Sequence, residues 1–355
     1  MRPSLLLPLA LAALSPAAAQ RAEGDFVARN FRFATGETLP EFRLHYTTLG
    51  RPRRDASGAV TNAVLMLHGT TGSGSALVAP MSLLFAPGEP LDTATYYVVF
   101  PDAIGHGRSS KPSDGLRMRF PKYDYDDMVD AQHRLLVEGL GVGRLRLIVG
   151  TSMGCMHAWV WGERYPGFAD ALVPLACAPT AIVGRNRIVR RLIVDAITSD
   201  PDWKGGDYAA PPLRGMRAAT ASLFMMVTAP HVLHRQAPTR AAADSTILAY
   251  LDRGSRAIDA NDMIYAFEAS RDYDPSPRLE SIGVPVLAIN FADDFVNPPE
   301  LGLMERLMPR VRRGRYVLVP TSEQTVGHGT HSRPAVWREH LVEFLRTTEG
   351  AGRSP

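Results

Sequence analysis

The stretch that decides the fold is Leu147-Ile148-Val149-Gly150-Thr151-Ser152-Met153-Gly154-Cys155-Met156. A short apolar run ends in the pattern Gly-x-Ser-x-Gly, and a helix-forming run follows it. This order predicts a strand, a sharp turn and a helix, with Ser152 raised at the carboxyl end of a parallel sheet. Glycines flank the serine because a side chain at position 150 or 154 would collide with the neighbouring strand and helix.

Composition limits the classes of protein to be considered. The chain has 355 residues, 45% hydrophobic and 21% charged, with a formal net charge of +3. These values are typical of a globular protein with one large α/β domain and an insertion. Because the charge is small and no long basic run is present, we expect no nucleic-acid partner.

The chain has two cysteines, Cys155 and Cys177. They give no Cys/His spacing of the kind that binds a metal, so we expect neither a metal nor a cofactor. Buried free thiols are the expected state of the pair. A disulfide formed after export is the alternative.

The first residues resemble a targeting signal. Arg2 gives a positive start, residues 5–14 are apolar, and Ala17-Ala18-Ala19 has the small side chains of a cleavage site. This pattern predicts a signal peptide over residues 1–19, cut before Gln20. The apolar run is too short to span a bilayer comfortably, which disfavours a retained anchor. We therefore expect a periplasmic or secreted protein with no stable membrane insertion after cleavage.

The rest of the chain alternates between strand-like and helix-like runs. An antiparallel hairpin is expected over residues 31–47, and strands at 63–67, 96–100, 171–175, 284–290 and 316–319. Helices are expected at 125–140, 156–165, 301–308 and 334–345. The sequence thus predicts an α/β fold with a mostly parallel central sheet flanked by helices.

The alternation stops between residues 181 and 279. Amphipathic runs follow one another there, at 188–197, 216–227, 246–258 and 263–269. They predict a helical insertion before the strand at 284–290, which we call the lid, over the carboxyl edge of the sheet. The core would then comprise residues 20–180 and 280–355. The alternative is a packed helical layer with no role in substrate choice.

A glycine-rich loop, His68–Gly74, directly follows the strand at 63–67. It lacks the lysine of a phosphate-binding loop, so an oxyanion hole is the better interpretation. The backbone N–H of Thr70 would pair there with that of Met153. His68 is expected to order this loop, and Asp102 and His106 to hold the loop that follows residues 96–100.

Three side chains complete a catalytic pattern in the chain order Ser152, Asp294, His328. Each follows a different predicted strand, as a serine, acid and histidine triad on this kind of sheet requires. His328 would remove the proton of the Ser152 hydroxyl, and Asp294 would orient and stabilise the imidazole. Asp293 remains the alternative acid and His331 the alternative base, because loop positions are hard to assign from sequence.

Nearly the whole chain after residue 20 resembles the homoserine O-acetyltransferase branch of the α/β-hydrolase superfamily. The matching stretches are residues 34–39, 45–50, 68–72, 120–121, 127–132, 150–154, 199–208 and 258–261. The lid match, Ser199-Asp200-Pro201-Asp202-Trp203-Lys204-Gly205-Gly206-Asp207-Tyr208, is more specific than Gly-x-Ser-x-Gly. The resemblance implies an α/β-hydrolase fold, a Ser/Asp/His triad, acyl transfer through an acyl-serine without a metal, and a homodimer formed through the lid.

The chain departs from that family at positions that concern specificity. The family turn reads G-G-S-M-G-G-M-Q, whereas Thr151, Cys155 and His157 differ here. The family arginine expected to hold an amino-acid carboxylate is replaced by Thr220, and Arg217 lies one turn away. The histidine loop reads Gly327-His328-Gly329-Thr330-His331 rather than the usual G-H-D.

These departures, and the lack of acetyl-CoA outside the cytoplasm, favour an exported serine hydrolase. It would cleave a small-molecule ester or related acyl bond, with water as the acceptor. The first alternative is an acyltransferase of the homoserine O-acetyltransferase type. The second is a non-catalytic binding protein, in which Ser152 would lie outside hydrogen-bond reach of His328.

Overall fold

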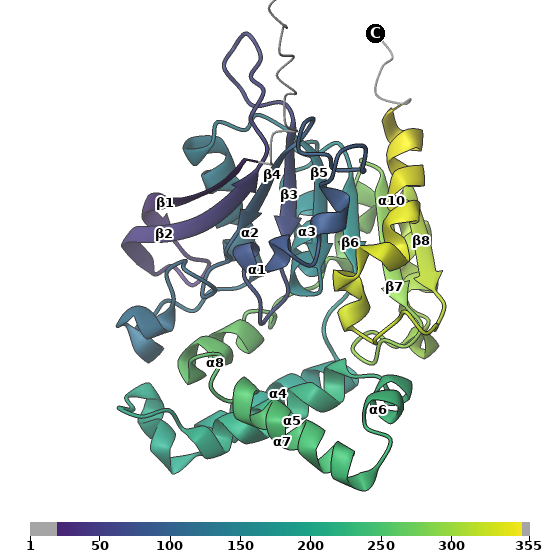
Figure 1. The fold of residues 1–355 in the computed structure, drawn as a ribbon. Coiled ribbons are helices and arrows are strands. Elements are labelled where there is room, and N and C mark those ends of the chain that lie inside the picture. The colour runs from purple at the N-terminus through teal and green to yellow at the C-terminus, as the bar shows by residue number, and fades with distance from the viewer. Residues whose placement is uncertain (1–19, 350–355) are drawn as a thin grey trace, which may run out of the picture.

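A computed structural model of the protein describes residues 20–349. Its centre is an eight-stranded sheet with helices on both faces (Figure 1). The strand order is β1-β2-β4-β3-β5-β6-β7-β8; β1 and β2 are antiparallel to their neighbours and the other six strands are parallel. This confirms the predicted α/β-hydrolase fold. The signal peptide expected over residues 1–19 lies outside the described residues.

The strands occupy the following ranges: β1 Arg21–Arg32, β2 Thr38–Leu49, β3 Ala63–Leu67, β4 Tyr97–Pro101, β5 Leu145–Thr151, β6 Leu172–Leu175, β7 Val286–Phe291 and β8 Gly314–Val319. Strands β3, β4, β6 and β7 are buried along their whole length, because helices cover both faces of the sheet. Their continuous apolar sequences follow from this two-sided burial.

Two hydrophobic clusters lie on opposite faces of the sheet. Helices α2 (Tyr125–Arg134) and α3 (Met153–Arg164) form one of them, with Trp159 and Trp161 at its centre. Helices α1 (Gly74–Val78) and α10 (Pro334–Glu349) form the other, around Trp337. Helix α9 (Leu303–Leu307) contributes Met304 to the first cluster. Burial of such side chains, worth about 1.5–3 kcal/mol each, fixes the loops at the strand ends.

The amino-terminal hairpin is longer than the sequence predicts. Strand β1 begins at Arg21 and pairs with β2 along its length, whereas strand was expected only from Phe31. Most side chains of residues 21–30 are exposed, so no alternation of apolar and polar residues marks them. The helix expected over residues 125–140 also differs: α2 ends at Arg134 and a wider π-helical turn, Leu135–Gly139, follows it.

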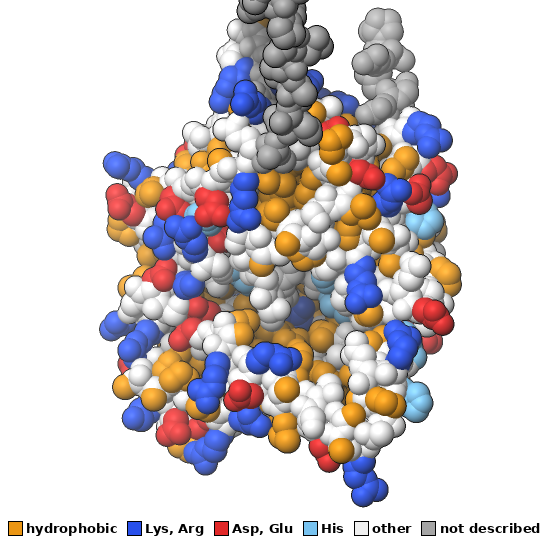
Figure 2. Space-filling model, viewed as in Figure 1, with side chains coloured by type: hydrophobic (Ala, Val, Ile, Leu, Met, Phe, Trp, Pro, Cys, Tyr) orange, Lys and Arg blue, Asp and Glu red, His pale blue; other side chains and the backbone are white. Residues whose placement is uncertain are grey.

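The lid contains five α-helices: α4 Gly184–Thr198, α5 Leu213–Val227, α6 Pro230–Gln236, α7 Arg240–Gly254 and α8 Ala260–Glu268. They have their own hydrophobic cluster, which includes Ile193, Met216 and Phe267. The lid packs across the end of the sheet (Figure 1), and the molecular surface is hollowed between the two (Figure 2).

Two lid helices differ from the expected pattern. The seven-residue helix α6 was not predicted, because it is too short to show a period. Helix α7 begins at Arg240 rather than Thr246, since its first turns are exposed and have no apolar face. None of the helices among residues 20–349 is long and apolar enough to cross a membrane.

Candidate active site

Ser152 occupies a strained turn between β5 and α3. Its φ of +53° is rare for a residue with a side chain, and neighbouring glycines make room for the turn. A Cβ at Gly150 would lie 1.9 Å from the Gly154 carbonyl oxygen, and one at Gly154 would lie 2.4 Å from the Leu67 carbonyl oxygen. The close approach of these backbones holds the serine side chain at the end of the sheet.

A chain of two hydrogen bonds joins Ser152 to a buried carboxylate. Nε2 of His328 lies 2.8 Å from Ser152 Oγ, and Nδ1 lies 2.8 Å from Asp294 Oδ2. A carboxylate only accepts hydrogen bonds, so the His328 proton resides on Nδ1 and the Nε2 lone pair faces the serine hydroxyl. In this tautomer His328 can receive the proton of the serine.

Asp294 is fully buried, and its surroundings favour the charged form. Burial by itself would raise the pKa of this carboxyl group. The charge and the hydrogen bond of His328 outweigh burial, together with bonds from Asn297 Nδ2 (3.1 Å) and the Val296 N–H (2.8 Å). The net result is a pKa below the ordinary value, and Asp294 remains an anion that stabilises a histidine cation.

The two alternative residues take other positions. Asp293 accepts a hydrogen bond from the Gly327 N–H (2.8 Å) and faces His231 (3.5 Å). The ring of His331 lies 5.1 Å from that of His328, and its Nδ1 bonds to Ser332 Oγ. Burial, reinforced by the His328 charge, lowers the pKa of His331 to about 3. The structure therefore brings together Ser152, Asp294 and His328, and neither alternative belongs to that chain of hydrogen bonds.

Two backbone amides are free to bind an oxyanion beside Ser152. The Gly69 carbonyl is held by the Gly72 N–H (2.9 Å) and by His68 Nδ1 (2.8 Å), which turns the opposite end of that planar peptide, the Thr70 N–H, away from them. Within residues 20–349, the N–H groups of Thr70 and Met153 donate to no acceptor. Met153 also lies at the positive end of the twelve-residue helix α3.

Contacts of His68 and of the loop after β4 hold the glycine-rich loop, residues 68–74, in place. Nε2 of His68 accepts from the Ala103 N–H (3.0 Å), and burial, followed by the influence of His106, lowers the His68 pKa to about 3. His68 is therefore neutral. Nε2 of His106 lies 2.7 Å from the Thr70 carbonyl oxygen. These contacts give both histidines an ordering role.

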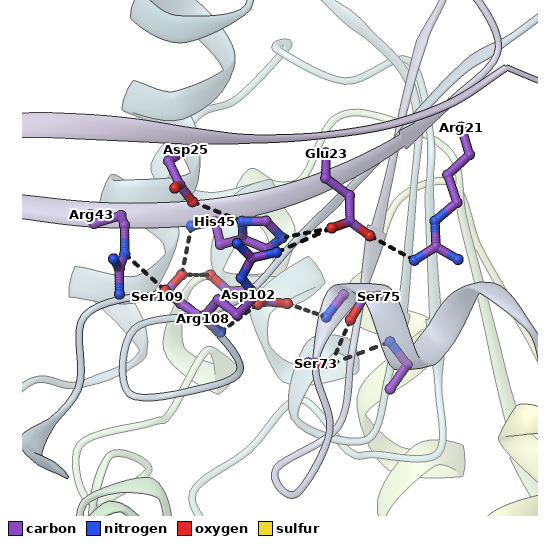
Figure 3. A network of polar contacts seen from close by, with 12 residues as sticks. Arg21, Glu23, Asp25, Arg43, His45, Ser73, Ser75, Asp102, Arg108 and Ser109 are labelled. Carbon is purple, nitrogen blue, oxygen red and sulfur yellow. Dashed lines mark hydrogen bonds and ion pairs between the residues drawn. The ribbon is translucent and has the colours of Figure 1, made fainter. Parts of the chain in front are cut away.

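A polar network anchors the far end of the same loop (Figure 3). The Asp102 carboxylate accepts from the Gly74 N–H (2.6 Å) and the Arg108 N–H (2.8 Å). Ser109 Oγ donates to the Asp102 carbonyl (2.8 Å) and accepts from the His45 N–H (3.0 Å). The network thus ties the start of α1 to the β1–β2 hairpin, and Asp102 acts within it as a structural residue.

Ser152 opens into a cavity of about 250 Å³ between core and lid. Its walls include Thr70, His328 and His331 from the core, and Arg190, Leu223 and Phe267 from the lid. A second cavity of about 340 Å³ shares residues 70–73 and Phe267 with the first, and contains Lys111 and Asp262. Among residues 20–349, no cluster of three or more histidine, cysteine or acidic residues is arranged to hold a metal ion.

Cys155 and Cys177 form a disulfide, so the expectation of free thiols was wrong. Their Cα atoms lie 5.9 Å apart, although 22 positions separate them in sequence. Parallel strands β5 and β6 end side by side, and this brings the first turn of α3 next to the segment after β6. The sequence alone did not show this proximity.

The structure adds residues that the motifs did not single out. Asn297 donates both to Asp294 and to the Ala176 carbonyl (2.9 Å), so it positions the catalytic acid. The run Asp294-Phe295-Val296-Asn297-Pro298-Pro299 was the sequence feature that could have indicated this role.

The position of the family arginine has a different environment here. Thr220, which occupies that position, donates its hydroxyl to the Met216 carbonyl (2.7 Å). Neither Thr220 nor Arg217 lines the cavity at Ser152.

Comparison with known proteins defines the class. The pattern of the alpha/beta hydrolase fold family matches residues 62–319. The structure superposes on esterase E22 with a TM-score of 0.79 and 19% identity, over 92% of this chain and all of the esterase chain. This likeness shows the fold, so the protein is an α/β hydrolase in the structural sense, a class that contains both hydrolases and acyltransferases.

The sequence places the chain within that class more narrowly. A probable acyltransferase of Methanothermobacter thermautotrophicus is 30% identical over 90% of this chain and 96% of its own. A homoserine O-acetyltransferase of Haloarcula marismortui is 31% identical over 71% of each chain. The chain belongs to the α/β-hydrolase fold family, in its homoserine O-acetyltransferase-like branch.

Proposed function

We propose that the protein is an exported serine hydrolase that cleaves a small ester through an acyl-Ser152 intermediate. The observation that carries this proposal is the hydrogen-bonded series Ser152, His328 and Asp294, with both links at 2.8 Å. A binding protein would have no need of this geometry, which therefore argues against a non-catalytic role.

The first half of the reaction forms the acyl-enzyme. Ser152 Oγ attacks the ester carbonyl while His328 Nε2 removes its proton. The negative charge that develops on the carbonyl oxygen is stabilised by the N–H groups of Thr70 and Met153, and one such donor contributes about 10²–10³-fold in rate. His328 then gives its proton to the departing alcohol.

The second half releases the acid. His328 removes a proton from water, the resulting hydroxide attacks the acyl carbonyl, and Ser152 recovers its proton as the carbon–oxygen bond breaks. Asp294 stays charged throughout and stabilises the histidine cation in both halves. No other chemical group is required by these steps.

Two observations support water as the acceptor. Thr220 replaces the family arginine and lies outside the cavity at Ser152, which removes that anchor for an amino-acid acceptor. The disulfide between Cys155 and Cys177 suits an oxidising compartment, in agreement with the predicted signal peptide, and acetyl-CoA is absent there. We accordingly propose a periplasmic or secreted location.

The second candidate is an acyltransferase, favoured by the names of the relatives at 30% and 31% identity. Both reactions share the acyl-serine, and they differ in the molecule that attacks it. Steady turnover of p-nitrophenyl acetate in buffer alone, with no O-acetylhomoserine formed from acetyl-CoA and homoserine, is the result expected of the hydrolase. A burst without turnover that is relieved by an added alcohol would instead favour the transferase.

A further inference from the structure

Arg190 is a buried cation in the cavity that contains Ser152. It lies on α4, and its residue surface is only 4% exposed. It shares the cavity with Ser152 and His328, although it comes from the lid and they come from the core. No motif in the sequence marks it.

All the groups that contact the Arg190 guanidinium are neutral. Nε donates to Asn186 Oδ1 (2.9 Å), Nη1 donates to Ser270 Oγ (3.0 Å), and the ring centroid of Phe267 lies 5.6 Å from Cζ. Tyr125 also interacts with Arg190, and it is an uncharged phenol because burial raises its pKa in spite of that cation. Within the described part of the chain, no carboxylate oxygen lies within 4.0 Å of this guanidinium.

Two other arginines of the same helix have a carboxylate partner. Arg187 pairs with Glu268 (3.4 Å) and Arg191 pairs with Asp195 (3.5 Å), and both are far more exposed to solvent than Arg190. Arg185, the fourth arginine of α4, also has no carboxylate partner, but it is exposed and donates to the Phe295 carbonyl. Arg190 is therefore the buried arginine of this helix, and it has no carboxylate to balance its charge. A buried positive charge with no opposite charge beside it lowers the stability of the fold. An anion bound at the cavity wall would recover that free energy.

We propose that Arg190 binds a carboxylate of the substrate, so that the protein prefers small esters that carry a negative charge. This inference rests on the proposed hydrolase function and names its substrate class. A guanidinium has a planar pair of donors that suits a carboxylate, and it stays charged at every physiological pH.

The rest of the cavity strengthens this interaction. Leu223, Met226 and Phe267 give the cavity an apolar wall, and a low local polarity increases the attraction between opposite charges. The volume of about 250 Å³ lies below the usual range for drug-sized ligands, so a short substrate is expected. Arg190 is on α4, whereas the position of the family arginine, Thr220, is on α5, so this is a different anchor.

The carboxylate can lie on the acyl or the alcohol side of the ester, and paired substrates distinguish the two. On the acyl side, p-nitrophenyl hemisuccinate is compared with neutral p-nitrophenyl pentanoate. On the alcohol side, acetoxyacetate is compared with neutral acetoxyacetone. The wild-type enzyme should show kcat/KM at least tenfold higher for the charged member of one pair.

Variants of α4 then test the residue. Arg190→Gln should reduce that preference by about 10- to 100-fold, the range expected for the loss of a charged hydrogen bond, and Arg190→Lys should retain part of it. Arg191→Gln removes a neighbouring but exposed charge and should leave both rates unchanged. Equal losses for charged and neutral esters in Arg190→Gln, or a wild-type enzyme with no preference in either pair, would overturn the proposal.

Two further measurements keep the outcomes distinct. If Arg190→Gln does not fold, the proposal is tested by the preference of the wild-type enzyme for charged esters and by the partial loss of that preference in Arg190→Lys. If no ester is hydrolysed at all, the proposed function fails. Calorimetric titration of Ser152→Ala with succinate then tests the carboxylate site by itself. Binding that is weakened in Ser152→Ala/Arg190→Lys and lost in Ser152→Ala/Arg190→Gln supports the site, and absence of binding in Ser152→Ala contradicts it.

Discussion

Asp294 Oδ2 is shared by two donors, His328 Nδ1 at 2.8 Å and Asn297 Nδ2 at 3.1 Å. Asp293, its neighbour in sequence, instead holds the Gly327 N–H. A single step along the chain thus separates the carboxylate that orients the histidine from one that shapes the loop before it.

Substitution of the two aspartates by asparagine should change kcat to different extents. Asp294→Asn places a donor beside His328 and favours the wrong tautomer, so kcat for p-nitrophenyl acetate should fall by about 10⁴-fold. Asp293→Asn keeps a carbonyl oxygen for Gly327 and should lower kcat by less than about tenfold. Comparable losses in the two variants, measured at equal thermal stability, would contradict the assignment of the acid.

The disulfide should contribute measurably to stability. Loss of the cross-link frees a loop of 22 residues in the unfolded chain, for which the entropy model gives about 3 kcal/mol. Urea unfolding of Cys155→Ala/Cys177→Ala should show this decrease relative to the oxidised wild type. The reduced wild type provides the control, and an unfolding midpoint unaffected by reduction would mean that the bond does not form in solution.

The glycines beside Ser152 should not tolerate a methyl group. Gly150→Ala places a Cβ 1.9 Å from the Gly154 carbonyl oxygen and should destabilise the fold by more than about 3 kcal/mol. Gly283→Ala is the matched control, because nothing lies within 4 Å of its added Cβ. Thermal unfolding compares the two variants, and a Gly150→Ala protein as stable as Gly283→Ala would refute the backbone crowding.

Glu163 on α3 should make stability depend on pH. Its side chain is 5% exposed and Oε1 has no hydrogen-bond partner; burial raises the pKa to about 7 despite the opposing charge of Arg278. Because the folded-state pKa exceeds the ordinary 4.5, the stabilisation is complete below about pH 4.5 and is lost as pH rises through 7.

Glu163→Gln removes this titration. Between pH 5 and pH 8, the free energy of unfolding of the wild type should fall by about 1–2 kcal/mol more than that of Glu163→Gln, after allowance for solvent near Arg278. Urea unfolding at the two pH values measures the difference. Parallel pH profiles for the two proteins would show that Glu163 titrates normally in the folded state.

The elements with strong local patterns could be predicted from sequence. The β-branched run before Ser152, its flanking glycines and the apolar parallel strands each determine their own structure. Residues 21–30 could not be predicted because pairing with β2, rather than a period of their own, makes them regular. Helix α6 is too short to show a period, and its side chains His231 and Arg235 contact core loops at Asp293 and Glu323 that are distant in sequence.

The site shows the same division. The chain order of Ser152, Asp294 and His328 could be recognised in the sequence. The choice between the adjacent aspartates could not, because it depends on which carboxylate the loop directs toward His328. The disulfide depends on two strand ends that meet only in the folded sheet. Arg190 gave no signal, since an arginine in an amphipathic helix is ordinarily exposed, whereas this one is buried against Phe267 and Ser270, which are distant from it in sequence.

The identity of the acylated atom shows directly whether Ser152 is the nucleophile. The protein beginning at Gln20 is mixed with p-nitrophenyl acetate, quenched with acid within the first turnover and examined by mass spectrometry, beside Ser152→Ala. We predict one acetyl group on the peptide that contains Ser152, formed with a burst of nitrophenolate, and neither in the variant. Turnover that persists in folded Ser152→Ala would show that Ser152 is not the nucleophile.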